Sequence, residues 1–415
     1  METLSRCFAA VLTVWSLSSW AGPLQDCADQ FIGGDVRNAP TLYHSDPEKP
    51  FGSDVHLCYR DDDASFFALE YWPEEFAPRW AAYKLSPENY GPNGCNTFTR
   101  KVNNCYTNAP TWQEALDCTN STYQGDPFHP EQMLRDQKLS ASAFGNTGHD
   151  RGHIAPRAAF SWHVCGTYQT FTMANMSPQR ALLNQQIWSR LEAQVLTWAV
   201  DEGPIYVVTG VTFGPFPYTR FQVFADGKLD PNYLYHEGQT LQETMTRHHT
   251  LHDEYPNSSE LLHPLRDAKP AKVAKEVQDM RVPTGYFKVI YRPARDGEEA
   301  KAIGFLIPHT YQNLNELTKA YGMNRGRGKN SQKDQDFWFF RSRIDLIEEA
   351  SGVSFPGIPE TLKASYPSND WWNQRRTARN IRSDDCGRGT PQGVLPDSTQ
   401  EERIAACTDT QSVGH

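Results

Sequence analysis

Asp150-Arg151-Gly152-His153 and, further along the chain, Asn184 and Glu192 have types and spacing that suit the hydrolysis of phosphodiesters. Imidazole titrates near neutral pH, so His153 can take a proton from water. The amide oxygen of Asn184 can bind a hard cation such as Mg²⁺, which takes few protein ligands and keeps several waters. The guanidinium of Arg151 is permanently charged and matches phosphate oxygens.

Each of these residues also has an ordinary structural interpretation. A lone histidine is most often a satisfied structural residue, and an asparagine near a helix start is often a cap. Arg151 can instead form a salt bridge with Asp150 or Glu192, and Glu192 can be a surface acid. Because Gly152 allows a tight backbone and Pro156 stops a strand, we expect His153 to be presented on a turn.

The chain from Ala181 to Val200 has the periodicity of a helix, and Pro178 stands just ahead of it. Its apolar column consists of Leu183, Ile187, Leu191 and Val195. The neighbouring column consists of Asn184, Trp188 and Glu192. A helix therefore puts Asn184 and Glu192 on the same side, two turns or about 12 Å apart along the axis.

Short β-branched and aromatic runs predict strands around this helix. These runs are Val55–Tyr59, Phe66–Tyr71, Trp80–Leu85, Ile205–Gly210, Tyr286–Tyr291 and Ala302–Ile307. A short helix is expected at Ile344–Glu349, whereas residues 225–280 are polar and predict an insertion that is partly helical at its end. Hairpins with segregated helices favour an α+β fold with an antiparallel sheet.

The charge balance of the chain is uneven. The 415 residues carry a formal net charge of −10, which by itself disfavours nucleic-acid binding. Residues 151–200, however, contain one acid, Glu192, and the arginines Arg151, Arg157, Arg180 and Arg190. We therefore expect a basic site within an acidic protein, in which Arg151, Arg157 and Arg180 bind substrate.

The first residues are typical of a secretory signal peptide. Arg6 is followed by a mostly apolar run from Cys7 to Trp20, and small residues precede a cut after Ala21. A membrane anchor is the alternative, although the run is shorter than the ~20 residues of a span. Cleavage leaves eight cysteines, and an even set in an exported protein implies disulfides, with 105 possible pairings. Proximity in sequence suggests Cys27 with Cys58 and Cys386 with Cys407.

Three longer motifs resemble the DNA/RNA non-specific endonuclease family, which has the ββα-metal fold. They are Asp150-Arg151-Gly152-His153-Ile154-Ala155-Pro156, Asn175-Met176-Ser177-Pro178-Gln179, and the Asn-x-x-x-Trp-x-x-x-Glu pattern from Asn184 to Glu192. The likeness covers roughly residues 50 to 358. The cysteine pair ahead of the Ala82-Tyr83-Lys84-Leu85 strand is similar to the exported, endonuclease-domain branch of this family.

The resemblance implies a role for each of four residues. His153 would be the general base, Asn184 the direct ligand of one Mg²⁺ (or Mn²⁺), and Glu192 a partner of the metal-bound waters. Arg151 would neutralise the charge that develops in the transition state. The products would carry 5′-phosphates, and both DNA and RNA would be cut because the backbone is gripped rather than the bases.

One departure from the family concerns phosphate binding. An arginine often precedes the family's Asp-Pro pair, but the residue five places before Asp126-Pro127 is Ser121. Arg100 and Lys101 are the candidates to replace it. A phosphodiesterase for smaller substrates, or a catalytically silent binding module of the same fold, therefore stays open beside an exported nuclease. The oligomeric state is not predicted.

Three other features have alternative interpretations that the sequence does not resolve. His248-His249-x-x-His252 has the spacing of zinc ligands, and Trp371-Trp372 with its neighbouring arginines could bind nucleic acid. The basic segment 324–333 could follow a phosphate backbone or be a solvated loop. The expected organisation is a signal peptide at 1–21, one nuclease domain at 22–360 that includes the 225–280 insertion, and a polar extension at 361–415. We expect a secreted or periplasmic protein.

Overall fold

The computed structural model describes most of the chain between residues 22 and 366 and a few residues near its end. The described residues are 22–43, 54–62, 64–90, 126–131, 134, 139–145, 147–217, 231–254, 275–312, 314, 336–366, 399, 401–402, 405 and 412–414. The signal-peptide prediction, Arg100 and Lys101, the 324–333 segment, Trp371-Trp372 and the Cys386–Cys407 pairing lie outside them.

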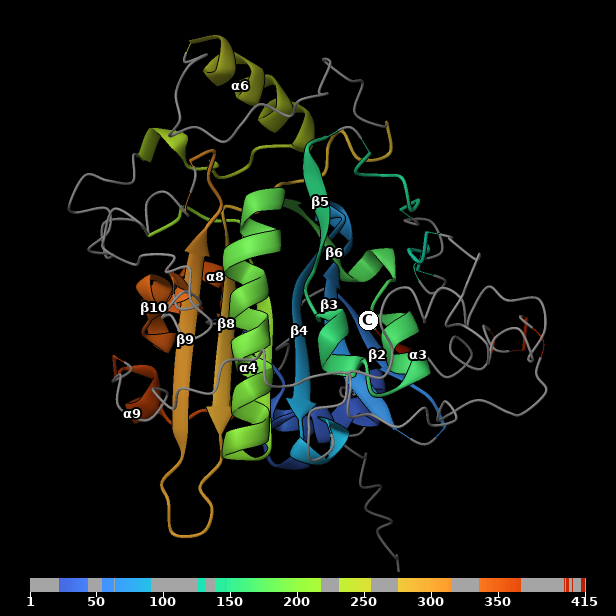
Figure 1. The fold of residues 1–415 in the computed structure, drawn as a ribbon, viewed down its shortest axis with the longest axis vertical. Helices are drawn as coiled ribbons and strands as arrows, with labels where there is room; N and C mark the ends of the chain where they lie inside the picture. The colour runs from blue at the N-terminus through green and yellow to red at the C-terminus, as the bar shows by residue number, and fades with distance from the viewer. Residues whose placement is uncertain are drawn as a thin grey trace, which may run out of the picture.

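An eight-stranded antiparallel sheet is the centre of the molecule, with the strand order β10-β9-β8-β7-β4-β3-β2-β12 (Figure 1). Its strands are β2 (Val55–Arg60), β3 (Ser65–Trp72), β4 (Ala77–Leu85), β7 (Ile205–Thr212), β8 (Gly285–Arg292), β9 (Lys301–Pro308), β10 (Arg341–Ser342) and β12 (Ser412–Gly414). All six strands expected from the sequence are present, each extended by a few residues. The α+β fold with an antiparallel sheet is thereby confirmed.

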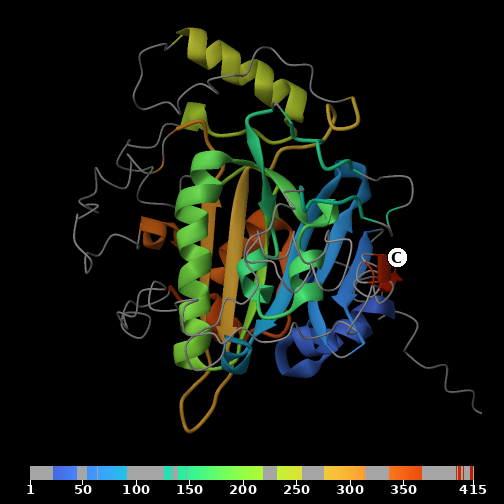
Figure 2. The same cartoon turned by 45° about the vertical axis from the view of Figure 1, so that its right-hand side comes forward.

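The central strands are buried along nearly their whole length because layers of chain cover both faces of the sheet. Phe305 packs against Trp198 of α4 (Ser189–Glu202), whereas a Cβ on the adjacent Gly304 would meet Ile347 of α8 (Ile344–Ser351). Adjacent residues of a strand point to opposite faces. The two helices therefore lie on opposite sides of the sheet, and Figure 2 shows α4 standing off one face.

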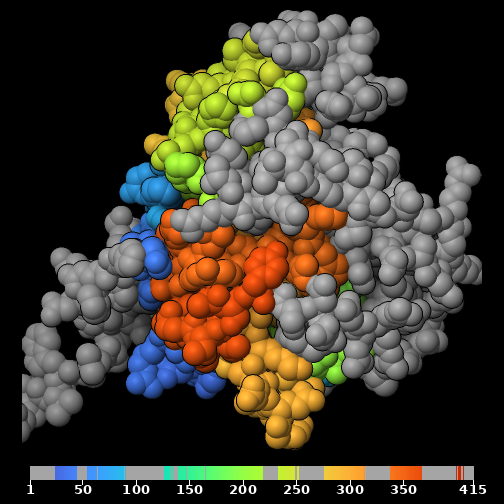
Figure 3. Space-filling view, turned by 90° about the vertical axis from the view of Figure 1, so that its left-hand side faces the viewer, coloured from blue at the N-terminus to red at the C-terminus, as the bar shows by residue number. Residues whose placement is uncertain are grey.

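The face that carries α8 is completed by segments from both parts of the chain. Strand β1 (Thr41–Leu42) pairs with β11 (Val353–Ser354), and α9 (Glu360–Lys363) follows. Figure 3 shows the N-terminal segment in blue beside residues 336–366 in orange and red. The short 3₁₀ elements are Gly22–Gln30, Ile32–Gly34, Val36–Asn38, Pro73–Glu75, Pro87–Tyr90, Arg157–Phe160, Met173–Asn175, Pro231–Tyr233 and Asp336–Phe340.

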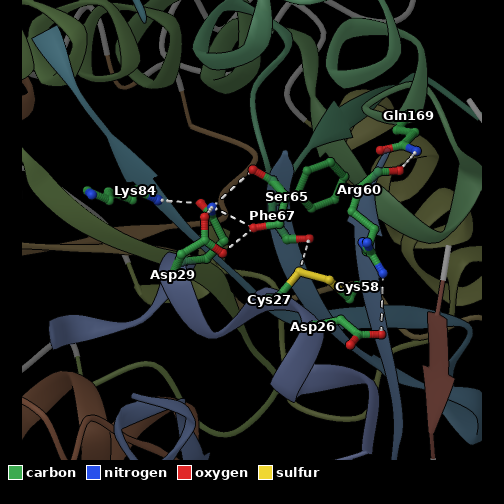
Figure 4. Close-up of a disulfide and its surroundings, with 10 residues drawn as sticks. Asp26, Cys27, Asp29, Cys58, Arg60, Ser65, Phe67, Lys84 and Gln169 are labelled. Atoms are coloured by element: carbon green, nitrogen blue, oxygen red, sulfur yellow. Dashed lines mark hydrogen bonds and ion pairs between the residues drawn. A yellow bond between two sulfur atoms is a disulfide. The ribbon is translucent and has the colours of Figure 1, made fainter. Parts of the chain in front are cut away.

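A disulfide joins the N-terminal 3₁₀ segment to the sheet. Cys27 is bonded to Cys58 of β2, and both side chains are fully buried (Figure 4). Gln30 extends this attachment, because its side-chain amide donates to the carbonyl of Ser65 and accepts from the backbone N–H of Lys84. The pairing expected for Cys27 is confirmed. Cys165 is also disulfide-bonded.

Strands β4 and β7 are neighbours in the sheet, but the chain makes a long excursion between them. This excursion contains a separate two-stranded sheet, β5 (His149–His153) with β6 (Met176–Arg180), and α3 (Val164–Gln169) between the two strands. The π-helical turn η10 (Leu183–Trp188) and α4 follow without a break. The helix expected at Ala181–Val200 is confirmed, and Pro178 stands ahead of it, within the strand β6 that leads into the helix.

A second apolar cluster lies beside the excursion, and part of the supposedly polar 225–280 insertion builds it. The helix described in this segment is α6 (Leu241–Glu254), in the middle of that range, and residues 255–274 lie outside the described part of the chain. The buried members of the cluster are Phe128, Leu139, Ala143, Phe144, Phe171, Met173, Met176, Tyr235, Leu241, Met245, Val277, Met280, Val282 and Tyr311. The inserted segment therefore packs against Met176 of β6, which precedes it, and against Tyr311, which follows β9. Within the described part of the chain, no helix is long and apolar enough to cross a membrane.

Candidate active site

The β5–β6 pair places Arg151 and His153 on the same strand. His153 lies opposite Met176 at the end of β5, so it occupies the end of a strand rather than the turn expected from the sequence. The side chain of Asn175 fixes the chain that follows, because it accepts from Ala155 N and donates to Ala155 O at 2.8 and 2.9 Å. The backbone around His153 is therefore held on both sides.

Gly152 lets the two strands approach closely. A Cβ at this position would lie 2.5 Å from Oε1 and 2.6 Å from Cβ of Gln179, a residue that is itself fully buried. Side-chain atoms cannot approach this closely without moving the strand. The glycine in the Asp-Arg-Gly-His motif is therefore required by strand packing.

An open pocket of about 590 Å³ lies over β5 and the start of η10. Its lining residues are Asp126, Phe128, Ala141, Ser142, Phe144, Gly145, His149, Asp150, Arg151, His153, Asn184 and Gln185. His153 and Asn184, which are well separated in the sequence, thus line the same pocket together with Arg151.

Asn184 is oriented by an acid from the strand beside it. Its amide nitrogen donates to Oδ2 of Asp150 at 2.9 Å, and Gln185 donates to the same oxygen at 2.8 Å. Asn184 lies inside the helix, whose π-helical turn is preceded by Leu182, and so it is not the cap of that turn. With its nitrogen bound to Asp150, the amide presents its oxygen as the atom suited to a cation.

Arg151 is held by contacts that the sequence did not predict. Its Nη1 donates to Oδ2 of Asp126 at 2.7 Å and to the carbonyl of Ala141 at 2.6 Å. The guanidinium carbon lies 3.6 Å from the centre of the Phe128 ring, a cation–π contact. The salt-bridge partner is therefore Asp126 rather than Asp150 or Glu192. Asp126 belongs to the Asp-Pro pair noted in the sequence.

Aromatic rings pack against the imidazole of His153. Phe128 and Phe171 lie 5.6 and 5.2 Å from it, centre to centre. The segment that carries Phe128 is tied to the core by Glu131, whose buried carboxylate accepts hydrogen bonds from Tyr59 at 2.6 Å and Thr172 at 2.7 Å. The histidine is thus half-buried in a fixed aromatic wall, which limits its rotation.

Glu192 lies two turns beyond Asn184 and is not among the residues that line the pocket. Desolvation raises the pKa of its carboxyl to about 7, opposed by the positive charge of Lys288, the indole N–H of Trp188 and the positive charge of Arg157. Lys288 is fully buried in β8, and desolvation lowers its pKa to about 8. Lys288 was not predicted as a site residue, because one lysine in an apolar strand gives no signal of its contacts in the sequence.

The other two expected substrate-binding arginines lie away from the pocket lining. Arg180 is only 4% exposed at the end of β6, where its backbone N–H donates to Nε2 of His309 and its charge lies next to Tyr235. Arg157 begins a 3₁₀ turn and its charge acts on Glu192. A direct contact of either residue with substrate stays a prediction.

A cluster of possible metal ligands, Asp61, His163 and Cys165, occurs elsewhere among the described residues. Nε2 of His163 lies 3.2 Å from Oδ2 of Asp61, and the disulfide of Cys165 removes the thiolate that a soft metal needs. The histidines at 248, 249 and 252 lie on α6, but their side chains are outside the described part of the structure. The oxygen donors of the pocket are the better match to a hard cation.

Comparison with known proteins identifies the family. The model of the DNA/RNA non-specific endonuclease family matches residues 58–357. A nuclease of Nostoc sp. (strain PCC 7120) is 30% identical over 131 residues, covering 31% of this chain and 47% of the relative. The mitochondrial endonuclease G of Bos taurus is 31% identical over 102 residues, covering 24% of this chain and 32% of the relative.

The matches to these curated relatives span less than half of their length. A crystal structure of the EndoG/EndoGI complex aligns with a TM-score of 0.44 and 16% identity, covering 74% of this chain and 91% of that chain. The family model accounts for most of the described domain, including the strand, the turn and the helix that form the pocket. The chain therefore belongs to the DNA/RNA non-specific endonuclease family.

Proposed function

We propose that this protein is an exported, Mg²⁺-dependent endonuclease that hydrolyses phosphodiester bonds of DNA and RNA. The observation that carries the proposal is the shared pocket, which the imidazole of His153 and the guanidinium of Arg151 line together with the carboxamide of Asn184, a residue distant from both in the sequence. The family to which the chain belongs supports action on nucleic acids.

In this mechanism His153 is the general base. Its ring takes a proton from the attacking water, and the aromatic wall holds it in one orientation. Arg151 lies in the same pocket and neutralises charge on the phosphoryl oxygens. To do so it must exchange its hydrogen bond to Asp126 for one to phosphate, while its contacts to Phe128 and the Ala141 carbonyl can remain.

The donor atoms of the pocket fit a hard divalent cation. The amide oxygen of Asn184 would hold the ion, with Asp150 orienting the amide, and Glu192 would hydrogen-bond to the waters that complete its shell. Such an ion, Mg²⁺ or Mn²⁺, would supply positive charge to stabilise the leaving 3′ oxygen, which would give a product with a 5′-phosphate.

Export is part of the proposal. The disulfide between Cys27 and Cys58 and the further disulfide of Cys165 support an oxidising compartment, in which such bonds persist. A secreted or periplasmic location is consistent with the signal-like first residues. Recognition of the backbone rather than of base edges would allow the enzyme to cut both kinds of nucleic acid.

The test is nicking of supercoiled plasmid at a series of Mg²⁺ concentrations and in EDTA. We expect nicking that requires the cation, and a loss of about 100-fold or more in His153→Ala, because a general base contributes this much. Asn184→Ala should need a higher Mg²⁺ concentration for its half-maximal rate. His236→Ala is the matched control, because His236 is exposed and lies away from the pocket.

Other outcomes would contradict the proposal. A His153→Ala variant with the rate of the unmodified protein would remove the general base from the mechanism, and an unchanged Mg²⁺ dependence in Asn184→Ala would remove the ligand. Cleavage of small diesters without nicking would favour a phosphodiesterase. Binding of nucleic acid without cleavage at any cation concentration would favour a silent binding module.

A further inference from the structure

We propose that Lys288 is a positioning residue of the active site, which acts through Trp188 to hold the carboxylate of Glu192 in place. The inference rests on the proposed function, because Glu192 matters only if its carboxylate works in catalysis. Lys288 lies in the central sheet, whereas Glu192 lies on the helix that covers the sheet.

The position of Lys288 is unusual for a lysine. It is fully buried in the middle of β8, opposite Thr209 of β7 and Phe305 of β9. Its Nζ donates to the hydroxyl of Tyr83 at 3.3 Å and lies 4.7 Å from the centre of the Trp188 ring. A lysine is almost never fully buried unless its charge is balanced, so these contacts and a nearby acid must offset its desolvation.

Trp188 connects the lysine with the helix. It lies four residues after Asn184 and four before Glu192, so the three side chains form one column on the helix. The Trp188 side chain is fully buried, and its ring contacts Tyr286 at 5.7 Å as well as Lys288. The ammonium of Lys288 therefore holds the indole of Trp188 in place. Asn184 and Glu192 each lie about one helical turn from Trp188.

The charged groups that face Glu192 come from two elements. Lys288 acts from β8 and Arg157 from the 3₁₀ turn of residues 157–160, and both lower the pKa of the carboxyl against its desolvation. Glu192 in turn raises the pKa of Lys288, whose own desolvation lowers it. Each charge therefore favours the other, and removal of Lys288 must make Glu192 harder to ionise.

Arg292 is a second buried cation on the same strand, and its contacts are those of a structural residue. It is also fully buried, lies four residues after Lys288 and so shares its face of β8. Its guanidinium forms a direct ion pair with Glu298 at 2.9 Å and lies 3.8 Å from Glu202 at the end of α4. Lys288 instead contacts the hydroxyl of Tyr83 and the indole of Trp188, and its charge acts on Glu192 of the proposed site. Arg292 is therefore a matched control.

The primary experiment measures the pKa of Glu192 in the metal-free protein by NMR of ¹³C-labelled glutamate carboxyls. The signal is assigned by its absence in Glu192→Gln. We expect Lys288→Met to raise this pKa by about one unit or more, because a nearby opposite charge has been removed. Arg292→Met should leave it unchanged. A Glu192 pKa that does not move in folded Lys288→Met overturns the inference.

A reciprocal measurement keeps the inference falsifiable if Lys288→Met does not fold. In Glu192→Gln the pKa of Lys288, followed by NMR of ¹³C-labelled lysine, should fall further below about 8 because the favourable acid is gone. An unchanged Lys288 pKa would contradict the coupling. Neither NMR measurement depends on nuclease activity, so a failure of the proposed function is distinguishable from a failure of this inference.

Activity then tests what the coupling does. The acidic limb of kcat/KM against pH should move to higher pH in Lys288→Met, since Glu192 must lose its proton to work. Lys288→Arg, which keeps the charge, should restore the limb at least in part, and Arg292→Met should not move it. A Lys288→Met variant that loses rate equally at all pH values would indicate a merely structural role.

Discussion

At the scale of single residues, the polar groups of the site are already engaged with protein partners. Asp150 holds the nitrogen of the Asn184 amide, and Asp126 holds the guanidinium of Arg151. The first contact orients the amide that we propose as the metal ligand. The second contact occupies the guanidinium that we propose as the phosphate-binding group, so in this proposal substrate displaces a carboxylate from Arg151.

The Asp126–Arg151 pair leads to a prediction about affinity. Asp126→Asn should tighten binding of nucleic acid by up to about fivefold, the range of an exposed ion pair, because Arg151 no longer has to give up an acid. The measurement is Kd for a short duplex by fluorescence anisotropy at two salt concentrations, and the gain should shrink at high salt.

The control for this prediction is Asp35→Asn. Asp35 forms an exposed ion pair with Arg37 in the N-terminal segment, and its loss should not change the Kd. Weaker binding in Asp126→Asn would contradict the prediction and would mean that Asp126 serves to orient Arg151.

Sequence reasoning succeeded at this scale where the chemistry is contiguous. The Asp-Arg-Gly-His motif and the Asn184 column carry their signal in a few adjacent positions, and the structure brings His153, Arg151 and Asn184 to one pocket. Lys288 gave no such signal, and the Asp126-Pro127 pair did not reveal that Asp126 binds Arg151, because both roles depend on contacts made by folding. The turn expected at His153 was wrong because the backbone of residues 149–153 pairs with β6.

At the scale of elements, the site depends on the distance between two short strands and one helix. Gly152 allows β5 to lie against Gln179 of β6, and the helix begins directly where β6 ends. A shift of β5 would move Arg151 and His153 together, whereas Asn184 on the helix would stay. The geometry of the pocket is thus sensitive to a small change in strand packing.

Gly152→Ala is expected to displace β5. The variant should lose about 1–3 kcal/mol of stability from overpacking, and its nuclease rate should fall even where it is fully folded. Urea unfolding and plasmid nicking give the two values. Gly214→Ala is the control, because a Cβ there would make only an ordinary contact, 3.8 Å from the Ala350 carbonyl. Full activity in folded Gly152→Ala would contradict this account.

Secondary structure was largely predictable because buried strands are rich in β-branched and aromatic residues. The 225–280 segment was harder. Its apolar residues, such as Leu241, Met245 and Val277, are spaced among many polar ones, and they become a core only by packing against Phe128 and Phe171. The π-helical form of Leu183–Trp188 was not predicted, because the apolar column is the same in an α-helix.

At the scale of the whole molecule, one sheet is covered on both faces and fastened to the N-terminal segment. The disulfide between Cys27 and Cys58 closes a loop across a sequence separation of 31 residues. Beneath it, the backbone of β2 pairs with β3 on one side and β12 on the other. The N-terminal segment thus packs on the sheet, and none of its residues is among those that line the pocket.

Removal of this disulfide should change stability and leave chemistry intact. Cys27→Ala with Cys58→Ala should lower the free energy of unfolding by about 3–4 kcal/mol, the chain-entropy value for a loop of this length. Calorimetric Tm measures the change, and plasmid nicking below the transition should proceed at the rate of the unmodified protein. Loss of nicking in the folded double variant would mean that the disulfide also shapes the pocket.

The attachment of β12 was absent from the sequence prediction, because three residues in a polar extension carry no recognisable strand pattern. Ser412 lies opposite Cys58, the same residue that receives the disulfide from Cys27. Segments from near the two ends of the polypeptide are therefore neighbours in space. Proteins with this property commonly tolerate circular permutation. A short linker could join β12 to the segment that starts at Gly22, which contacts it, and the chain could be opened in the β8–β9 hairpin instead, so that the order of the gene can change while the pocket stays intact.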